Sequence, residues 1–146
     1  MNALELMKKD HAELKKMMGQ LESTTERGVK TREQLFAKIK RELQVHETIE
    51  EEIFYPALKE HPKAKELVLE GYEEHHAVDT LVGELETVPF DDERWGAKFT
   101  VIKENIEHHI EEEEGEMFSK ARQVFDKSEL DDLGGRMEQR KATVAV

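Results

Sequence analysis

The chain contains no cysteine, only three prolines, few aromatic residues and no long apolar run. Without cysteine it cannot form a disulfide, a thiolate nucleophile, a zinc finger or an iron–sulfur site. No stretch approaches the roughly 18 consecutive apolar residues of a membrane-spanning helix, so we expect no contact with a membrane. Because residues 1–16 also lack the apolar run of a signal peptide, we expect a cytoplasmic protein.

Acidic residues are in surplus. The 146 residues include 34 Asp and Glu against 22 Lys and Arg, which gives a formal charge of −12. A surface of this sign repels a phosphate backbone, so we expect no nucleic-acid partner. The length is that of one domain with a real core. The seven histidines and the many carboxylates are therefore either solvated surface or a binding site.

The composition favours helices, because Glu, Lys, Leu, Ala and Met dominate. Turn signals divide the chain into four long segments and a shorter last one; they fall at Gly28, 61–62, 87–92 and 126–128. In the last segment, Ser128 and Asp131 predict the start of a short helix. This segment also contains the Gly134-Gly135 pair and ends in an apolar tail at 142–146. The helix is therefore expected to be either frayed or docked on the bundle.

Each long segment carries an inward-facing stripe of residues spaced three and four apart. The stripes are Leu4, Met7, His11, Leu14, Met18 and Leu21; Leu35, Ile39, Leu43, His46, Glu50, Ile53 and Ala57; Val68, Tyr72, His75, Val78, Val82 and Leu85; and Phe99, Ile102, Ile106, His109, Glu113 and Met117. We predict an all-α, antiparallel up-down-up-down four-helix bundle over residues 1–126. A short C-terminal helix and tail would occupy residues 127–146.

Every stripe is interrupted near its middle by a histidine, and two stripes also by a glutamate. The pattern H-x-x-x-E at His46 and Glu50 recurs at His109 and Glu113, so the chain resembles two related helical hairpins. This spacing places both side chains on one helix face, one turn apart. Facing hairpins would gather four imidazoles and two carboxylates at mid-bundle. That set suits two metal ions, each glutamate being able to bridge them.

Other acidic and histidine residues have simpler interpretations. The acidic runs 50–52 and 111–114 are predicted to be mostly solvated helix faces, with only Glu50 and Glu113 directed inward. His61 is predicted to lie at the surface, and His76 and His108 at the surface or just outside the site. A single core histidine is more often a hydrogen-bonded packing residue than a ligand, but a matched set needs a common explanation.

Several groups remain open as an additional ligand. Glu47 could reach the site, because it lies about 60° from Glu50 around the helix. Asp79 lies one turn after His75. Tyr55 and Tyr72 are expected mainly to pack, although a phenol near a redox metal can hydrogen-bond or ligate. A water molecule could also complete the site.

The donor set favours iron, with manganese or zinc as alternatives, because imidazole and carboxylate ligands are present without sulfur. The ferritin-like di-iron pattern uses Glu-x-x-His on two helices. Here Glu73 and His76 alone have that spacing, and they lie off the stripe. Four histidines, one on each helix, indicate another arrangement.

The order H…HxxxE…H…HxxxE, over about residues 4–122, resembles the hemerythrin-like (HHE cation-binding) family. The acidic and aromatic run 51–56 matches the family as well, whereas Ser119 stands where the second copy would have proline. The resemblance implies a four-helix bundle with two non-haem iron ions joined by an oxo or hydroxo bridge. It also implies the ligands His11, His46, Glu50, His75, His109 and Glu113.

Two features differ from the oxygen-carrying hemerythrins. Asp79 replaces their fifth histidine, and the second motif is H-x-x-x-E rather than H-x-x-x-x-D. The chain looks more like bacterial hemerythrin-like proteins, including mycobacterial ones with peroxide chemistry. It also looks like the hemerythrin domain of the eukaryotic F-box iron sensor, whose additional glutamate ligand corresponds to Glu47.

Anionic ligands favour ferric iron. We therefore expect a stable di-ferric centre that does not carry oxygen reversibly. The expected partners are hydrogen peroxide and dioxygen, and the leading hypothesis is catalase-like decomposition of hydrogen peroxide. The alternative hypothesis is an iron or oxygen sensor without turnover. A third hypothesis is an acidic helical bundle whose histidines serve only in packing.

Overall fold

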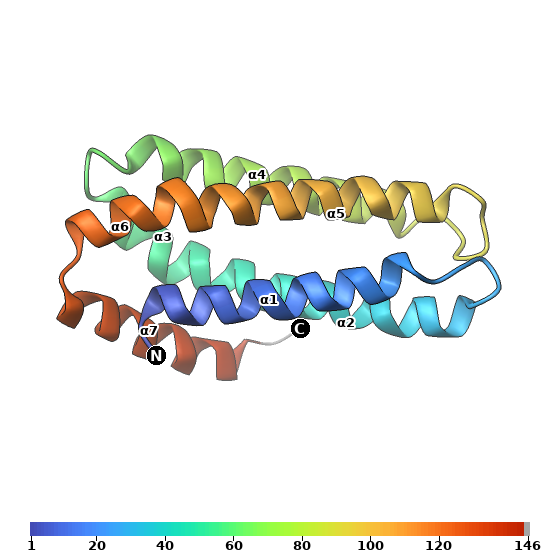
Figure 1. The fold of residues 1–146 in the computed structure, drawn as a ribbon, viewed down its shortest axis with the longest axis horizontal. Coiled ribbons are helices and arrows are strands. Elements are labelled where there is room, and N and C mark those ends of the chain that lie inside the picture. The colour runs from blue at the N-terminus through green and yellow to red at the C-terminus, as the bar shows by residue number, and fades with distance from the viewer. Residues whose placement is uncertain (145–146) are drawn as a thin grey trace.

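The computed structural model describes residues 1–144, and all of their regular structure is helical. The elements are α1 (Ala3–Glu22), α2 (Val29–Ile49), η1 (Glu50–Phe54), α3 (Tyr55–Lys59), α4 (Lys65–Leu85), α5 (Trp95–Glu112), η2 (Glu113–Met117), α6 (Phe118–Val124) and α7 (Lys127–Thr143). Because α2, η1 and α3 are continuous, as are α5, η2 and α6, the bundle has four long helices (Figure 1). The predicted antiparallel bundle with an additional C-terminal helix is confirmed.

Most residues of the predicted stripes form the core, but near the start of α2 Phe36 is buried where the stripe predicted Leu35, which is only partly buried. All six stripe residues of α1 are buried. The apolar core has two parts, one containing Met7, Phe54 and Phe118 and the other containing Leu14 and Trp95. The histidine and glutamate residues of the stripes lie between these two parts, so a polar layer crosses the middle of the bundle.

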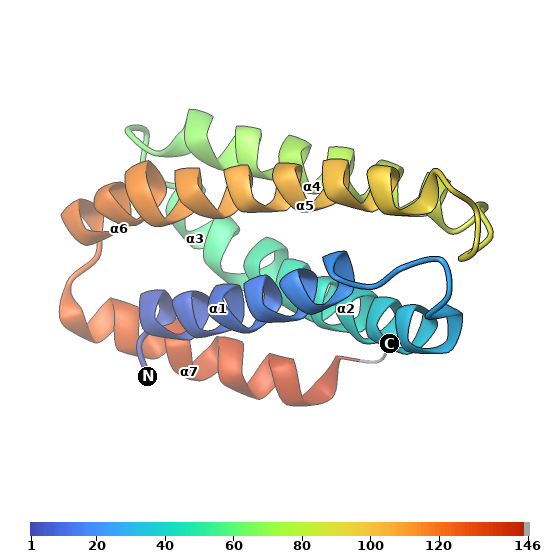
Figure 2. The same ribbon diagram turned by 45° about the vertical axis from the view of Figure 1, so that its right-hand side comes forward.

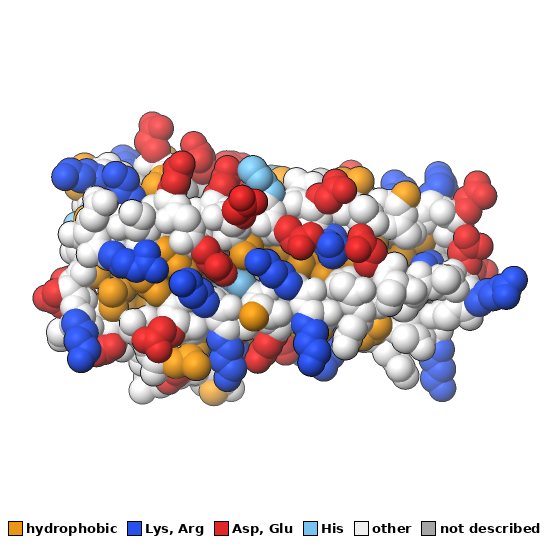
Figure 3. Space-filling view, viewed as in Figure 1, with side chains coloured by type: hydrophobic (Ala, Val, Ile, Leu, Met, Phe, Trp, Pro, Cys, Tyr) orange, Lys and Arg blue, Asp and Glu red, His pale blue; other side chains and the backbone are white. Residues whose placement is uncertain are grey.

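Most of the charge lies outside this core. Acidic and basic side chains are interspersed over the face shown in Figure 3, so the net charge of −12 is not gathered into one patch there. Within residues 1–144, none of the helices is long and apolar enough to cross a membrane.

Two π-helical turns, η1 and η2, interrupt the long helices at matching places. Each begins at the glutamate of an H-x-x-x-E motif, Glu50 or Glu113. A π turn adds one residue to a helical turn and is frequent at functional sites. The added residue shifts the buried face, so that Leu58 is fully buried where the stripe predicted Ala57, which is only partly buried. The sequence pattern did not reveal these turns.

The C-terminal helix α7 differs from the expected one in length and in its start. It has 17 residues, and its capping box pairs Asp126 with Glu129 rather than Ser128 with Asp131. The helix continues through Gly134 to Thr143. Gly134 packs directly against the residues that precede α1, where a Cβ atom would overlap the backbone of Met1 and Asn2. The helix is therefore docked. The last two residues of the predicted tail, 145–146, lie outside the described residues.

The close approach at Gly134 predicts a large difference between two neighbouring substitutions. Gly134→Ala is expected to destabilise the chain by about 1–3 kcal/mol, because the added methyl group forces α7 away from α1. Gly135→Ala is the matched control, since its Cβ atom would meet nothing within 4 Å. It should stabilise the helix by about 0.5–1 kcal/mol. Thermal unfolding of both variants tests this, and equal midpoints would contradict the docking.

Candidate metal centre

Six buried polar side chains converge in the middle of the bundle. His11 comes from α1, His46 from the last turn of α2, His75 from α4 and His109 from the last turn of α5, while Glu50 and Glu113 are the first residues of η1 and η2. All six are at most 7% exposed. The structure therefore brings together every residue that the stripe pattern singled out as a metal ligand.

The six side chains form two overlapping groups. One group consists of His11, His46, Glu50 and Glu113, and the other of Glu50, His75, His109 and Glu113; within each group the ligand atoms lie within 4.8 Å of one another. Both glutamates belong to both groups. Each group offers two imidazole nitrogens and two carboxylate oxygens, which is a suitable donor set for one cation.

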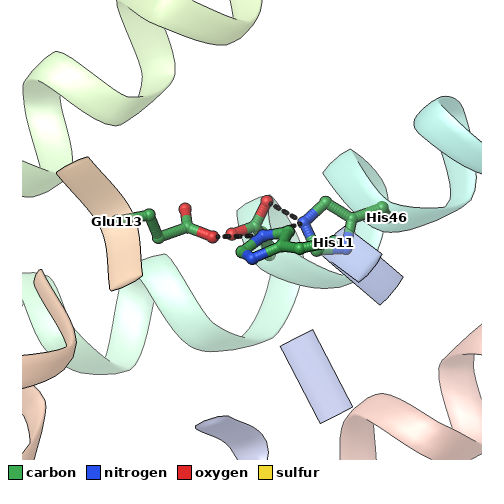
Figure 4. Close-up of side chains that lie close together, drawn as sticks. His11, His46 and Glu113 are labelled. Atoms are coloured by element: carbon green, nitrogen blue, oxygen red, sulfur yellow. Dashed lines mark hydrogen bonds and ion pairs between the residues drawn. The ribbon is translucent and has the colours of Figure 1, made fainter. Parts of the chain in front are cut away.

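The Nε2 atoms of the histidines face the shared carboxylates. His11 Nε2 lies 3.0 Å from Glu113 Oε1, and Figure 4 shows His11 and His46 side by side next to Glu113. On the opposite side, His109 Nε2 lies 3.2 Å from Glu113 Oε2. Glu50 Oε1 is equally central, at 2.8 Å from His46 Nε2 and 3.3 Å from His75 Nε2.

The glutamate oxygens provide a test of whether the residues fit a metal. Both oxygens of Glu50 and the Oε1 atom of Glu113 are buried and accept no hydrogen bond of acceptable geometry within residues 1–144. The imidazole nitrogens beside Glu50 Oε1 and Glu113 Oε1, at 2.8 Å and 3.0 Å, are close to them without hydrogen-bond geometry. Buried carboxylate oxygens are costly unless they are paired or coordinate a cation. Oxygen and nitrogen donors that converge without sulfur suit iron, manganese or zinc. The residues present therefore fit a pair of metal ions.

A second carboxylate contacts the Nδ1 atom of each site histidine, the ring nitrogen that does not face Glu50 or Glu113. The Nδ1 contacts are His11 to Glu114 at 2.7 Å, His46 to Asp10 at 3.2 Å, His75 to Glu51 at 2.8 Å and His109 to Glu74 at 2.7 Å. Such contacts orient a metal-binding imidazole and increase its basicity. The pairing is symmetric, because Asp10 and Glu74 directly precede a site histidine, while Glu51 and Glu114 directly follow a site glutamate.

The predicted exposure of the acidic runs was therefore wrong for Glu51 and Glu114. Both are half-buried and contact site histidines. The sequence reasoning also missed Asp10 and Glu74. Their position next to a stripe residue was the only available signal, and it could not show which histidine of the neighbouring helix each one meets.

The carboxylates make the site attractive to positive charge. Burial alone would lower the pKa of His46, but Glu50 and Asp10 outweigh this effect and raise it to about 10. Glu50 and Glu51 likewise outweigh burial at His75, whose pKa is raised to about 10. At His109 burial is outweighed in the same way, and the pKa rises to about 11. The three imidazoles are therefore protonated at neutral pH in the metal-free chain, and a bound metal would displace the proton of the ring nitrogen that it contacts.

Among the additional groups, Tyr55 reaches the centre. Its hydroxyl donates to Glu113 Oε2 at 2.5 Å and lies 3.5 Å and 3.4 Å from the Nε2 atoms of His75 and His109. Burial and the nearby Glu113 keep the pKa of Tyr55 well above its usual value. Tyr72 instead donates to the backbone carbonyl of Glu51 at 3.3 Å.

Glu47 lies close to the centre but belongs to neither main group. It is buried, and its carboxylate lies near His75 and Glu51. Burial is the main cause that raises its pKa to about 8, and Asp79 adds to the effect against the opposing influence of His75. Asp79 itself is exposed.

The remaining histidines lie away from the centre. His76 and His108 are exposed. His61 is partly exposed and packs its ring against Phe125 at 5.3 Å between centroids. These positions agree with the predicted surface locations.

A small cavity of about 20 Å³ adjoins the centre. It is lined by the four histidines, by Glu47 and by the apolar residues Leu14, Leu43, Val78, Ile106 and Ile110. A space of this size holds about one water-sized molecule. A second, surface groove of about 480 Å³ lies between α2 and α4, and Leu43 and Glu47 line both spaces.

Comparison with known proteins gives a consistent result. The family model of the hemerythrin HHE cation-binding domain matches residues 2–121. Among solved structures, the chain is similar to the crystal structure of a hemerythrin HHE cation-binding domain-containing protein from Mycobacterium kansasii. The two chains are 28% identical with a TM-score of 0.85, and the similarity covers 98% of this chain and 89% of the other. No curated protein sequence matches the chain significantly.

Proposed function

The chain belongs to the hemerythrin HHE cation-binding family, and we propose that it holds two non-haem iron ions and decomposes hydrogen peroxide as a catalase does. One ion would be held by His11 and His46 and the other by His75 and His109. Glu50 and Glu113, which belong to both groups, would bridge them. When bound, the pair supplies the reversible redox change that peroxide disproportionation requires.

The size of the cavity is the observation that carries this proposal. The cavity of about 20 Å³ is lined by both histidine pairs, by Glu47 and by aliphatic side chains, and it has no room for an organic substrate. The space itself holds about one water-sized molecule, so only very small reactants come close to fitting it. Hydrogen peroxide and dioxygen, with two heavy atoms each, are the reactants closest to this size.

Two buried groups could handle the protons of the reaction. The Tyr55 hydroxyl remains protonated, because its pKa is held well above the usual value, and it donates to Glu113 Oε2. With a pKa of about 8, the Glu47 carboxyl also retains its proton at neutral pH. Since Glu47 lines both the cavity and the surface groove, it is placed to pass a proton between them.

The alternative function is an iron or oxygen sensor without turnover. One observation favours it: α7 is tied to the π turn η1 by the bidentate ion pair of Arg140 with Glu52, at 2.9 Å and 3.2 Å. Because η1 begins at Glu50, a shift of Glu50 on metal binding would be transmitted through η1 to α7. Iron uptake without turnover would support this alternative.

Oxygen evolution from hydrogen peroxide tests the proposal. Iron-loaded wild-type chain is expected to evolve oxygen, and His46→Ala is expected to lose at least about 100-fold in rate, because it removes a ligand. The matched control is His76→Ala, which removes an exposed histidine on α4 and should leave the rate unchanged. No oxygen from the loaded wild type, or full activity in His46→Ala, would overturn the catalase-like function.

A further inference from the structure

The helix α7 lies beyond the part of the chain that the family model matches, yet it reaches the surroundings of the metal centre. Figure 2 shows it lying along α1. Its apolar face, formed by Leu130, Leu133 and Met137, is buried in the core. The contact at Gly134 determines where α7 sits on α1, so the last turns of the helix are held in a defined place.

From that place, Lys141 begins a chain of contacts that ends at the centre. Lys141 Nζ donates to Asp10 Oδ1 at 2.6 Å. The other oxygen of the same carboxylate, Asp10 Oδ2, lies 3.2 Å from His46 Nδ1. His46 Nε2 in turn lies 2.8 Å from Glu50 Oε1. Asp10 thus uses one oxygen for α7 and the other for a histidine of the site.

The equivalent carboxylate of the second hairpin, Glu74, is supported differently, by Glu112 and His108 of α5, whose polar atoms lie within 4.8 Å of it. Glu74 contacts Nδ1 of His109, just as Asp10 contacts Nδ1 of His46. Within residues 1–144, however, no lysine or arginine forms an ion pair with Glu74. The Glu74 side chain is 28% exposed, whereas that of Asp10 is 6% exposed. Water can solvate Glu74. Asp10 is almost fully buried and contacts α7 through Lys141, and a buried charge that loses its partner is strongly destabilising.

We propose that Lys141 is a positioning residue for one of the two metal positions, and that it acts through Asp10 on His46. With Lys141 present, Asp10 remains buried and keeps the His46 ring turned toward Glu50. Without it, Asp10 turns toward water and His46 loses the acceptor for its Nδ1 proton. The two metal positions are then unequal: the His11/His46 position depends on α7, and the His75/His109 position does not. The proposal rests on the two-metal site proposed above.

Titration of the metal-free full chain with cobalt(II), followed by visible absorption, tests the inequality. In wild type we expect two equivalents to bind. In Lys141→Met, which keeps the aliphatic stem, one equivalent is expected to weaken by about tenfold, the usual effect of losing an outer partner, while the other remains unchanged. Lys141→Arg should restore wild-type binding, because it restores the cation beside Asp10.

A matched control on the same helix separates positioning from docking. Arg140→Met removes the ion pair with Glu52 but leaves Asp10 and Lys141 in place, so both equivalents should bind as in wild type. The second readout is the shifted Nδ1–H proton resonance of each histidine in the cobalt-loaded chain. Lys141→Met should move the His46 resonance and leave the His109 resonance in place.

The outcomes distinguish this proposal from the proposed function. If wild type binds no metal, the two-metal site fails and this proposal fails with it. If wild type binds two equivalents and Lys141→Met titrates identically, only the role of Lys141 is overturned. It is likewise overturned if Arg140→Met produces the same loss, or if Lys141→Met weakens both equivalents equally.

Discussion

Replacing Glu113 with alanine is expected to remove both metal ions rather than one. Glu113 belongs to both ligand groups, with Oε1 facing His11 and Oε2 facing His109. The affinity of each position should fall by at least about 100-fold, because loss of a direct ligand exceeds the effect of losing an outer partner. The measurement is the metal content of each purified, iron-loaded variant by elemental analysis.

The matched comparison is His109→Ala, which removes a ligand from one group only. This variant is expected to keep the ion at His11 and His46. Glu113→Gln, which keeps the volume of the side chain but not its charge, shows whether a loss in Glu113→Ala reflects ligation rather than a cavity. If Glu113→Ala and His109→Ala lose the same amount of metal, Glu113 does not bridge the two positions.

Removal of the metal is expected to lower the thermal stability of the chain substantially. The centre buries two glutamates, and both oxygens of Glu50 and one of Glu113 accept no hydrogen bond of acceptable geometry within residues 1–144, so bound ions would stabilise the folded state over the unfolded one. Free metal at about 100 times its Kd stabilises the fold by about 2.7 kcal/mol for each site. For a chain of this length, that corresponds to about 9 °C per ion and roughly twice as much for two ions.

Differential scanning calorimetry of metal-loaded and chelator-treated chain measures this difference. The metal-dependent shift should vanish in Glu113→Ala and persist in His76→Ala, because His76 is exposed on α4. A wild-type midpoint that does not change when metal is removed would show that the buried cluster is stable by itself. In that case its histidines would serve packing alone.

The periodicity of the sequence was sufficient to predict the bundle and to bring its six central residues together. Polar residues on an apolar stripe are rare, and their repetition in two hairpins placed them at one height. The helix geometry carried this prediction, since residues three and four apart share a face.

The outer carboxylates could not be predicted in the same way. Glu51 and Glu114 belong to runs of glutamate in which each residue looks equally solvated, and the contact of each depends on a helix from the other hairpin. The π turns were also hidden, because one extra residue in a helical turn leaves little trace in a short pattern. The docking of α7 depends on the close approach of two backbones at Gly134, which a pair of glycines does not reveal from sequence alone.

The repeat also explains why the centre is nearly symmetric and where the symmetry ends. Both hairpins supply a histidine pair, a glutamate that belongs to both ligand groups and two outer carboxylates. The helix α7 has no counterpart in the repeat, and within residues 1–144 Asp10 is the one outer carboxylate of the site with which it forms an ion pair. Any difference between the two metal positions should therefore be traced first to this helix.

The central claim is that two cations lie between the histidine pairs and share both glutamates. Anomalous diffraction from crystals of the iron-loaded chain tests it most directly. We predict two iron peaks, one beside the Nε2 atoms of His11 and His46 and one beside those of His75 and His109, with Glu50 and Glu113 contacting both. A single peak, or peaks outside this cluster, would contradict the account.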